Sequence, residues 1–599
     1  MTPIKKIRQK PRLTGEPPKN HTYVGKKLKI IPLSGLEEIG KNCTIYEYGD
    51  DIVVVDLGLM FPNEEMPGVD YVVPDVSYLE KNKSKIRGII ITHGHLDHTG
   101  ALPYFVQKLG FPTIYTMPLT AEMIKSRLDE FKLTKKTPIK TLSHSDQINL
   151  GAFDVSFFRV NHNIPDAVGI IIRTPLGHVI HTGDYKFDHT PVDQAPAEFH
   201  KIAKAGGEGV LALLGDSTNS ELPGFAVSEK KIGETINHIF DQARGRIILS
   251  TFASLISRHQ QVIAAAINHD RKIAISGLSL EKNIEIAIRL NCIHIPKDRI
   301  IPMRHINDYP DNKIVVICTG AQGQETSALG RMSKGEHRDV QIKKGDMVVL
   351  SSSPIPGNER SVQNLMNSLY RLGAQVIYNK ILGVHVSGHA YQEEQKIMMS
   401  LAKPKFFIPI HGERFMLERQ AMTAHEIGIP KECTFVMSNG QIAEFIQDTN
   451  PAVIKQTREL HYTNLRTPIK GRISDQKLPA NYVMVDGLGI GDVGNIVLRD
   501  RQVMSQDGMF VVIVTVDNET LELIGSPDII SRGFVYLREA KGLLQETRKK
   551  VRDIVTSHTS VGHIENWSSL KSAIRDEIGS FLFQKTERRP LVLPVVIEV

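Results

Sequence analysis

The stretch GIIITHGHLDHTG, residues 88–100, brings three histidines and an aspartate together directly after a run of apolar residues. The apolar run is typical of a buried strand, and in an extended segment His93 and His95, two positions apart, point the same way. Asp97 and His98 follow where the chain must turn. Imidazole and carboxylate groups suit a borderline cation such as Zn²⁺. The stretch therefore predicts a strand that ends in a metal site.

Three further candidate ligands share one feature, a position just past an apolar strand. His162 follows VSFFRV, Asp184 follows HVIHTG and His411 follows FFIPI. Strand ends on one edge of a sheet converge, so residues far apart in the sequence can meet there. We expect two sets of three ligands with Asp184 as a bridge: His93, His95 and His162 in the first set, and Asp97, His98 and His411 in the second.

The number of ligands indicates the kind of site. Seven are too many for one tetrahedral zinc ion, and a structural zinc site would be closed and mostly cysteine. Two ions with open positions suit hydrolysis, because they lower the pKa of a bridging water and hold the attacking and leaving oxygens. A single histidine among the 23 of this chain would more often lie on the surface or in the core. Three of them in this spacing after a strand favour a hydrolytic centre.

The length and the charge distribution indicate the number of domains and the character of the N-terminus. A chain of 599 residues is longer than one hydrophobic core normally serves, so we expect three or more domains. The net charge of +7 is unevenly spread, since residues 1–29 hold nine lysines and arginines against one acid, Glu16. This basic, proline-rich head predicts a disordered arm over residues 1–26 that binds nucleic acid; a solubilising tail is the alternative.

The four cysteines lie far apart and form no C-x-x-C pair, which gives no support to a disulfide framework or a thiolate zinc ribbon. The N-terminus has no apolar signal core, and no apolar run approaches the ~18 residues that a membrane span needs. We therefore expect a cytoplasmic protein with no membrane contact.

The H-x-H-x-D-H motif with its downstream ligands resembles the metallo-β-lactamase superfamily, and Asp56 in VVVDLG matches its first motif, an acid that orients a ligand without binding the metal. Asp184 and His411 are 227 positions apart. The intervening segment resembles the β-CASP domain of nucleic-acid-processing members. The matching motifs are GDSTN, HVSGHA and PIHGE.

Other stretches are similar to the ribonuclease J family over nearly the whole chain from about residue 27: HTGDYKFDHTPVD, STFASLISR, TGAQGQETSALGR, SSSPIPGNE and IISRGFVY. The departures are small. Leu278 in SGLSLEKN stands where the family usually has arginine, which would weaken a contact with the RNA and leave the metals untouched.

The resemblance implies an α/β fold with three parts: a four-layer αββα metallo-β-lactamase sandwich, an inserted parallel-sheet β-CASP domain and a small α/β C-terminal domain. We place the sandwich at 27–222 and 383–450, the β-CASP domain at 223–382, a linker at 451–468 and the C-terminal domain at 469–599. The strand-helix alternation over about 223–382 independently predicts a parallel sheet covered on both faces.

The resemblance also implies a hydrolase, a ribonuclease with two Zn²⁺ per subunit (Mn²⁺ or Mg²⁺ as alternatives), in which a hydroxide attacks the RNA phosphodiester. His389 would stabilise charge on the scissile phosphate or move a proton, and Asp216 would hold its imidazole. A loop of small residues would hold the terminal 5′-monophosphate through closely approaching backbone N–H groups. Its members are His385, Val386, Ser387, Gly388, His389 and Ala390.

Such an enzyme would degrade RNA from 5′ to 3′, with internal cuts as well, in mRNA decay and rRNA maturation. It would form a homodimer or a dimer of dimers and meet other RNA-decay factors or the ribosome. Two alternatives stay open at this point: a DNA nuclease of the same superfamily, and an RNA-binding scaffold subunit without activity. The filled ligand positions argue against the scaffold.

A separate motif, MPGVDY, contains Gly68 and Asp70, and VDGLGIGDVG contains Asp486 and Asp492. By resemblance to some relatives, Gly68 and Asp70 with one of these acids predict a structural cation site. Carboxylate and carbonyl oxygens suit Ca²⁺ or Mg²⁺. Ordinary turn acids are the alternative interpretation.

Overall fold

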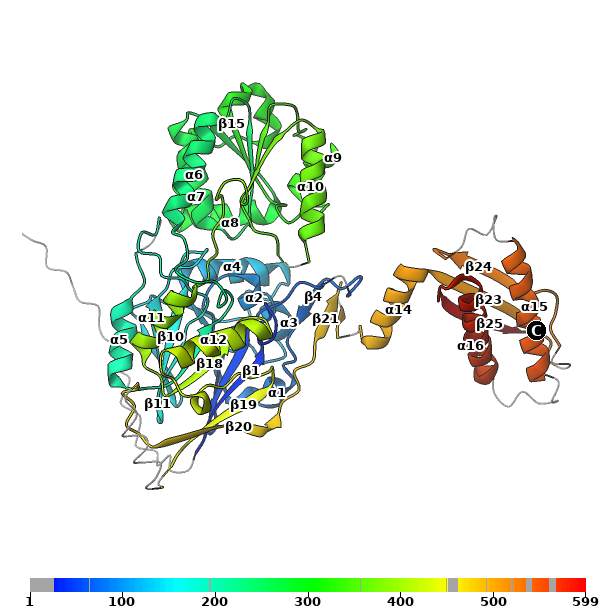
Figure 1. Ribbon diagram of the computed structural model, residues 1–599, viewed down its shortest axis with the longest axis horizontal. Helices are drawn as coiled ribbons and strands as arrows, with labels where there is room; N and C mark the ends of the chain where they lie inside the picture. Colours follow the sequence, from blue (N-terminus) through cyan, green and yellow to red (C-terminus); the bar gives the residue numbers. More distant parts are fainter. Residues whose placement is uncertain are drawn as a thin grey trace, which may run out of the picture.

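The computed structural model describes residues 26–599 apart from 64, 193–194, 356, 449, 451–461, 488, 492, 519, 521, 535–540 and 560–566. The predicted basic arm, except for Lys26, and most of the predicted linker therefore lie outside the described residues. Figure 1 shows a two-sheet sandwich, a second body above it in green, and a C-terminal unit that stands apart at the right.

The first sheet of the sandwich combines strands from both ends of the chain. In spatial order it contains β20 (Ile469–Lys477), β19 (Gln441–Gln447), β1 (Leu28–Ser34), β2 (Cys43–Tyr48), β3 (Asp51–Val55), β5 (Ile86–Ile90), β6 (Ile114–Thr116) and β7 (Ile139–Thr141). The pairs from β20 to β3 are antiparallel, and those from β3 to β7 are parallel.

The second sheet lies against the first and shares its core. Its order is β18 (Phe406–Ile410), β12 (Val210–Asp216), β11 (Gly177–His181), β10 (Val168–Thr174), β9 (Phe153–Arg159) and β8 (Gln147–Leu150). Apolar side chains of both sheets, such as Val53, Val55, Ile170 and Leu214, form one buried cluster between them. The alternation of strand residues between two faces leaves a second apolar face on each sheet.

Helices cover those outer faces. The first sheet packs against α1 (Ser77–Lys81), α3 (Leu102–Phe105) and α4 (Pro118–Glu130), and the second against α5 (Phe199–Glu208), α11 (Gln392–Ala402) and α12 (Arg414–Glu426). Helix, sheet, sheet and helix form four layers, which confirms the predicted αββα sandwich.

The inserted body is a five-stranded parallel sheet with helices on both faces. Its order is β14 (Lys272–Ser276), β15 (Ile314–Cys318), β13 (Ile247–Ser250), β16 (Met347–Leu350) and β17 (Gln375–Tyr378). One buried cluster joins the sheet to α6 (Glu229–Gln242), α7 (Ile256–Asn268) and α8 (Leu278–Arg289). Another joins it to α9 (Ala328–Lys334) and α10 (Glu359–Arg371). The parallel, doubly covered sheet agrees with the prediction.

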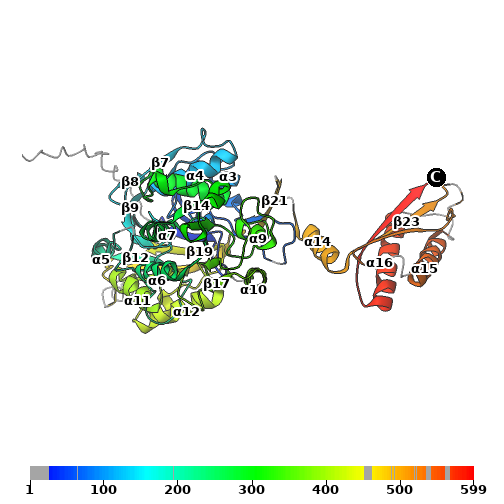
Figure 2. The ribbon, with the colours of Figure 1, turned by 90° about the horizontal axis from the view of Figure 1, so that it is seen from above.

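The insertion leaves and re-enters the sandwich between two neighbouring strands. β12 and β18 pair in parallel, with Asp216 opposite Ile410, although the whole inserted body lies between them in the sequence. Helix α8 of the inserted body contacts α4 of the sandwich through two partly exposed ion pairs, Lys282–Glu130 and Arg289–Glu122. Seen from above, the inserted body lies over the sandwich rather than beside it (Figure 2).

The boundary that we predicted at residue 469 is wrong. β20 belongs to the first sheet of the sandwich, and β21 (Val483–Asp486) pairs with β4 (Tyr71–Val73) of the same body and with β22 (Gly489–Ile490). An exposed, alternating segment offers no sign in the sequence of which sheet it will join. The chain leaves the sandwich only after β22.

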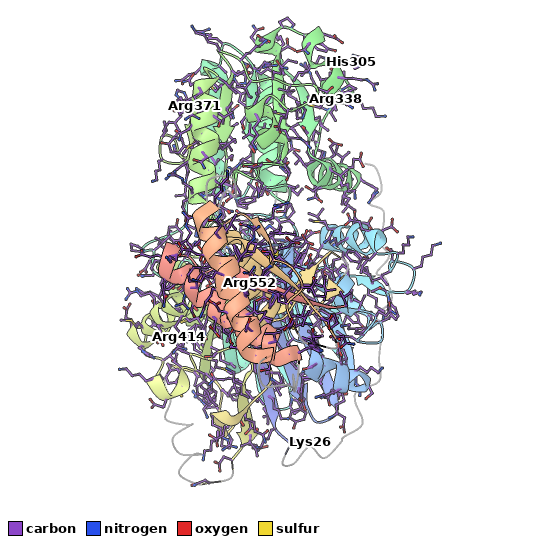
Figure 3. The ribbon with its side chains drawn as sticks, turned by 90° about the vertical axis from the view of Figure 1, so that its right-hand side faces the viewer. Lys26, His305, Arg338, Arg371, Arg414 and Arg552 are labelled. Atoms are coloured by element: carbon purple, nitrogen blue, oxygen red, sulfur yellow. The ribbon has the colours of Figure 1, made fainter. Side chains whose placement is uncertain are left out.

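The C-terminal unit follows α14 (Asn495–Asp507). It has a three-stranded sheet, β24 (Asp528–Arg532), β23 (Met509–Val516) and β25 (Leu591–Glu598), covered on one face by α15 (Lys541–Thr559) and α16 (Trp567–Thr586). In Figure 3 these helices, marked by Arg552, stand in front of the sandwich. Over the described residues, no helix combines the length and the apolar character that crossing a bilayer requires.

Candidate metal centre

The predicted ligands all follow strands that end at one rim of the sandwich. His93 comes after β5, and His95 directly precedes the short helix α2 (Leu96–Thr99), which carries Asp97 and His98. The other three follow β9, β11 and β18 of the second sheet: His162, Asp184 and His411. The two sheets thus supply the two halves of one cluster.

The first group is formed by three histidines and one aspartate. His93 Nε2 lies 3.0 Å from His95 Nδ1, which lies 3.1 Å from His162 Nε2. Asp184 Oδ2 is 3.6 Å from His93 Nε2 and 3.8 Å from His162 Nε2. These distances place four ligand atoms around one point, as a single metal ion requires.

The second group uses the same oxygen of Asp184. That Oδ2 lies 3.2 Å from His98 Nε2 and 3.6 Å from His411 Nε2, while Asp97 Oδ2 lies 3.4 Å from each of the two histidines. The structure therefore brings all seven side chains together in two groups that share Asp184.

In the first sheet, Asp56 holds the ring nitrogen of His98 that faces away from the metal centre. Its carboxylate accepts a hydrogen bond from His98 Nδ1 at 2.8 Å and from the Thr92 hydroxyl at 2.9 Å. The Thr92 oxygen in turn lies 3.1 Å from His93 Nδ1 and can accept its proton. Asp56 has φ 63°, a strained left-handed conformation for a residue other than glycine, as is common at functional sites.

The same arrangement recurs in the second sheet. His162 Nδ1 donates to the Gly388 carbonyl at 2.8 Å. His411 Nδ1 lies 2.6 Å from the Thr218 hydroxyl, which itself donates to Asp216 at 2.9 Å. In His93, His98, His162 and His411 the protein partner thus meets Nδ1, and Nε2 faces the centre, where a bound metal ion would use its lone pair.

The chemistry of the cluster fits divalent cations. Burial lowers the pKa of His93 well below its ordinary value and that of His95 to about 4, so both rings are neutral at neutral pH. His93 Nε2 and His95 Nδ1 lie 3.0 Å apart, close enough for two neutral ring nitrogens to bind the same cation. In the second group, burial opposes a positive charge on His411, but the negative charge of Asp184 outweighs it and raises the pKa of His411 to about 9. The carboxylates there favour a positive charge.

His389 and Asp216 lie beside the two groups. His389 Nδ1 is 2.8 Å from Asp216 Oδ2, and the ring stacks on His411 with 5.3 Å between centroids. Burial lowers the pKa of His389, but the charge and hydrogen bond of Asp216 raise it above the ordinary value. The carboxylate of Asp216 therefore favours the protonated form of the imidazole, and its hydrogen bond fixes Nδ1, which leaves Nε2 on the opposite side of the ring.

The predicted phosphate loop runs past the same rim. The Ser387 hydroxyl accepts a hydrogen bond from Asn219 Nδ2 at 2.7 Å, and Asn219 also donates to the carbonyl of His389 at 3.1 Å. The side chains of Val386 and Ala390 are buried in hydrophobic clusters, so only their backbone groups can serve a ligand. His385 is half-buried and close to the ring of Phe252.

Three residues that support the site were not predicted from the sequence: Thr92, Thr218 and Asn219. Each holds a ligand or the loop without binding a metal itself. The only signal for them is their position, since Thr92 precedes His93 and the other two follow Asp216 in GDSTN.

The predicted structural cation site is not supported. The guanidinium of Arg501 donates to the Gly68 carbonyl at 3.1 Å and to Asp486 at 2.5 Å, and Asp70 accepts from the Gly487 N–H at 2.8 Å. The oxygens that were expected to bind a cation therefore already accept hydrogen bonds, from the Arg501 guanidinium at Gly68 and Asp486 and from a backbone N–H at Asp70. Asp492 lies outside the described residues.

Comparison with known families identifies the parts of the chain. Residues 37–214 match the metallo-beta-lactamase superfamily, 244–369 the ribonuclease J beta-CASP domain, 376–433 the Zn-dependent metallo-hydrolase RNA specificity domain, and 496–599 the ribonuclease J C-terminal domain. The start of the last match agrees with the chain leaving the sandwich after β22.

Whole-length relatives and a solved structure extend the match. Ribonuclease J 1 of Streptococcus pyogenes is 40% identical over 95% of this chain and 97% of its own length, and ribonuclease J2 of Bacillus subtilis is 40% identical over 96% and 99%. A crystal structure of a protein of unknown function from Enterococcus faecalis covers 69% of this chain and 99% of its own, with TM-score 0.51 and 15% identity, and shows the fold alone. By its domains and its relatives, the chain belongs to the ribonuclease J family.

Proposed function

We propose that this protein is a metal-dependent ribonuclease that removes nucleotides from the 5′ end of RNA bearing a 5′-monophosphate, and that it also cuts internally. The observation that carries the proposal is the seven-residue cluster in two groups sharing Asp184, placed beside a loop that the sandwich and the inserted domain hold jointly. The family supports hydrolysis of RNA, and the loop supports recognition of an end.

The residues present fit two divalent ions, for which Zn²⁺ suits the mixed nitrogen and oxygen ligands and Mn²⁺ or Mg²⁺ are the alternatives. His93, His95 and His162 would hold one ion, Asp97, His98 and His411 the other, and Asp184 both. When bound, the ions supply Lewis-acid chemistry: they acidify water and neutralise charge on the scissile phosphate.

The roles of the other residues follow from their contacts. His389, whose pKa Asp216 raises, would donate its Nε2 proton to the leaving oxygen or stabilise charge on the phosphate. Asp216 fixes the tautomer because it accepts from Nδ1. Asp56 acts in the same way on His98, by holding its Nδ1.

The loop would receive the terminal phosphate through small residues and hydrogen-bond donors. The Ser387 hydroxyl and the backbone N–H of Gly388 are the donors that we propose, with His385 beside them. Burial lowers the pKa of His385 to about 3, so its ring would donate a hydrogen bond as a neutral group rather than a charge. The buried Arg258 behind the loop pairs with Glu229 and donates to the Val384 carbonyl, so it holds the loop in place.

The cellular processes, the partners and the oligomeric state that we infer rest on membership of the family. We infer that the protein acts in mRNA decay and rRNA maturation, and that it meets other decay factors or the ribosome. A homodimer or a dimer of dimers would form through the C-terminal unit. Its sheet supports this inference, because the face away from α15 and α16 exposes Ile530, Leu593 and Ile597.

The deciding experiment uses two matched RNAs that differ only in a 5′-monophosphate or a 5′-hydroxyl, with a DNA strand of the same sequence. We expect the wild-type protein to shorten the phosphorylated RNA fastest. Ser387→Ala should lose most of that preference and keep internal cutting, because the metal ligands are untouched. Equal losses on both RNAs would remove the end-recognition role. Preferred cleavage of DNA, or RNA binding without shortening when zinc is present, would overturn the proposal itself.

A further inference from the structure

The residues from Val384 to His389, here the bridging segment, are fixed at one end by the inserted domain. The Val384 carbonyl accepts hydrogen bonds from Arg258 Nη1 at 2.5 Å and from the Ser351 hydroxyl at 2.7 Å. Arg258 is wholly buried and pairs with Glu229 at 2.8 Å. A buried ion pair of this kind holds its hydrogen-bond partner in one place, because leaving either charge alone is costly.

At its other end the bridging segment contacts the metal centre directly. The Gly388 carbonyl accepts the Nδ1 proton of His162 at 2.8 Å, and Asn219 anchors the residues on both sides of Gly388. His162 contacts the segment although 226 positions separate it from Gly388. A loop expected to bind substrate therefore also supplies a partner to a candidate metal ligand.

The space at Gly388 shows how close this approach is. A Cβ there would lie 2.5 Å from His162 Nδ1 and 2.8 Å from Asn163 Cγ, well inside van der Waals contact. Gly388 does not adopt a positive φ, so closeness rather than backbone conformation requires glycine here. At Gly383, five positions earlier, a Cβ would meet nothing within 4 Å.

We propose that the Gly388 carbonyl is a positioning group for His162, so that the bridging segment sets the orientation of a metal ligand as well as receiving the RNA end. With its proton on Nδ1 held by this carbonyl, His162 presents the Nε2 lone pair to the first group. The statement that the bridging segment also receives the RNA end rests on the proposed function of the loop. A backbone shift that a bound 5′ end causes would change metal affinity, and metal would change the affinity for the end by the same factor.

The test measures metal affinity without any RNA. Zinc is titrated into the full-length apoprotein against a competing chelator, for wild type, Gly388→Ala and the matched control Gly383→Ala. We expect Gly388→Ala to bind the metal about 10- to 100-fold more weakly, the range for loss of a partner that orients a ligand. Gly383→Ala should stay within about twofold. Visible spectra of the Co²⁺-loaded proteins should change for Gly388→Ala alone.

Asn219→Ala provides a second variant in case the added methyl group prevents folding, which circular dichroism would reveal. It loosens the bridging segment around Gly388 without adding bulk, and we expect about threefold to tenfold weaker zinc binding. Unchanged zinc affinity in a folded Gly388→Ala protein, or in Asn219→Ala where the first variant does not fold, would overturn the inference. The Ser387→Ala assay tests end recognition separately, because that variant keeps the Gly388 carbonyl and the hydrogen bond from Asn219 to the His389 carbonyl.

Discussion

The rim that holds the seven ligands and the corner formed by Gly68, Asp70 and Asp486 both contain carboxylates that could bind a cation, but they differ in what those carboxylates and their neighbours already contact. At the rim, protein partners hold the outer ring nitrogens of His98, His162 and His411, and the inner nitrogens and oxygens face one another within 4.8 Å. At the corner, Arg501 and a backbone N–H already occupy the oxygens. Donor type alone does not define a cation site, because the partners of each donor decide whether it is open.

The largest expected effect comes from removing a donor at the rim. His93→Ala should lower bound metal and reduce RNA cleavage by about a thousandfold, since several kcal/mol of transition-state stabilisation depend on the ions. RNA affinity should change little. Metal analysis and single-turnover cleavage measure both, with the exposed His200→Ala as control. Full turnover in His93→Ala would contradict the ligand assignment.

A second prediction concerns the proton on His389. Asp216→Asn should lower kcat about a hundredfold, within the range for general acid catalysis. The substitution should also lower the pH above which activity is lost. The sign follows from the raised pKa: the acid form persists until pH exceeds that pKa, and removing the Asp216 charge lowers it. A pH–rate profile with the same alkaline limit in both proteins would refute this role.

A third prediction addresses the partners of the ligands. Asp56→Asn should weaken zinc binding about tenfold, because the amide cannot accept the His98 proton as a carboxylate does. Asparagine tolerates the left-handed backbone of this position, so the fold should persist. Chelator competition gives the affinity, and the exposed Asp50→Asn is the matched control. Equal affinities in the two variants would place Asp56 outside the centre.

The smallest effect is expected at the corner. Arg501→Ala should leave the metal content unchanged and cost about 0.5–1 kcal/mol in the free energy of unfolding, as for a partly exposed ion pair. The exposed Arg499→Ala on the same helix is the control. The unfolding temperatures of the wild type and of both variants are measured with and without Ca²⁺. Stabilisation of the Arg501→Ala protein by Ca²⁺ would show that the oxygens form a cation site once the guanidinium is gone.

The sequence allowed the position of the centre to be predicted, because each ligand follows an apolar strand, and the four-layer fold was predicted from the resemblance of its motifs to the metallo-β-lactamase superfamily. It did not reveal the partners that hold the outer nitrogens. Gly388 and His162 are 226 positions apart, and the contact between them involves a backbone atom that every residue possesses. The occupation of the corner by Arg501 could not be foreseen for the same reason, since it depends on how α14 leaves the sandwich.

The parallel pairing of β12 with β18 has a consequence for how the enzyme is made. Asp216 ends the first of these strands, and the second begins at Phe406, after the entire insertion has been translated. At about 5–20 residues per second, the ribosome needs on the order of 10–40 seconds for that stretch. During this interval the emerging chain has six of its seven ligands but not His411. A partly synthesised copy therefore cannot complete its centre until β18 and His411 have been added, although the other six ligands are already in the chain.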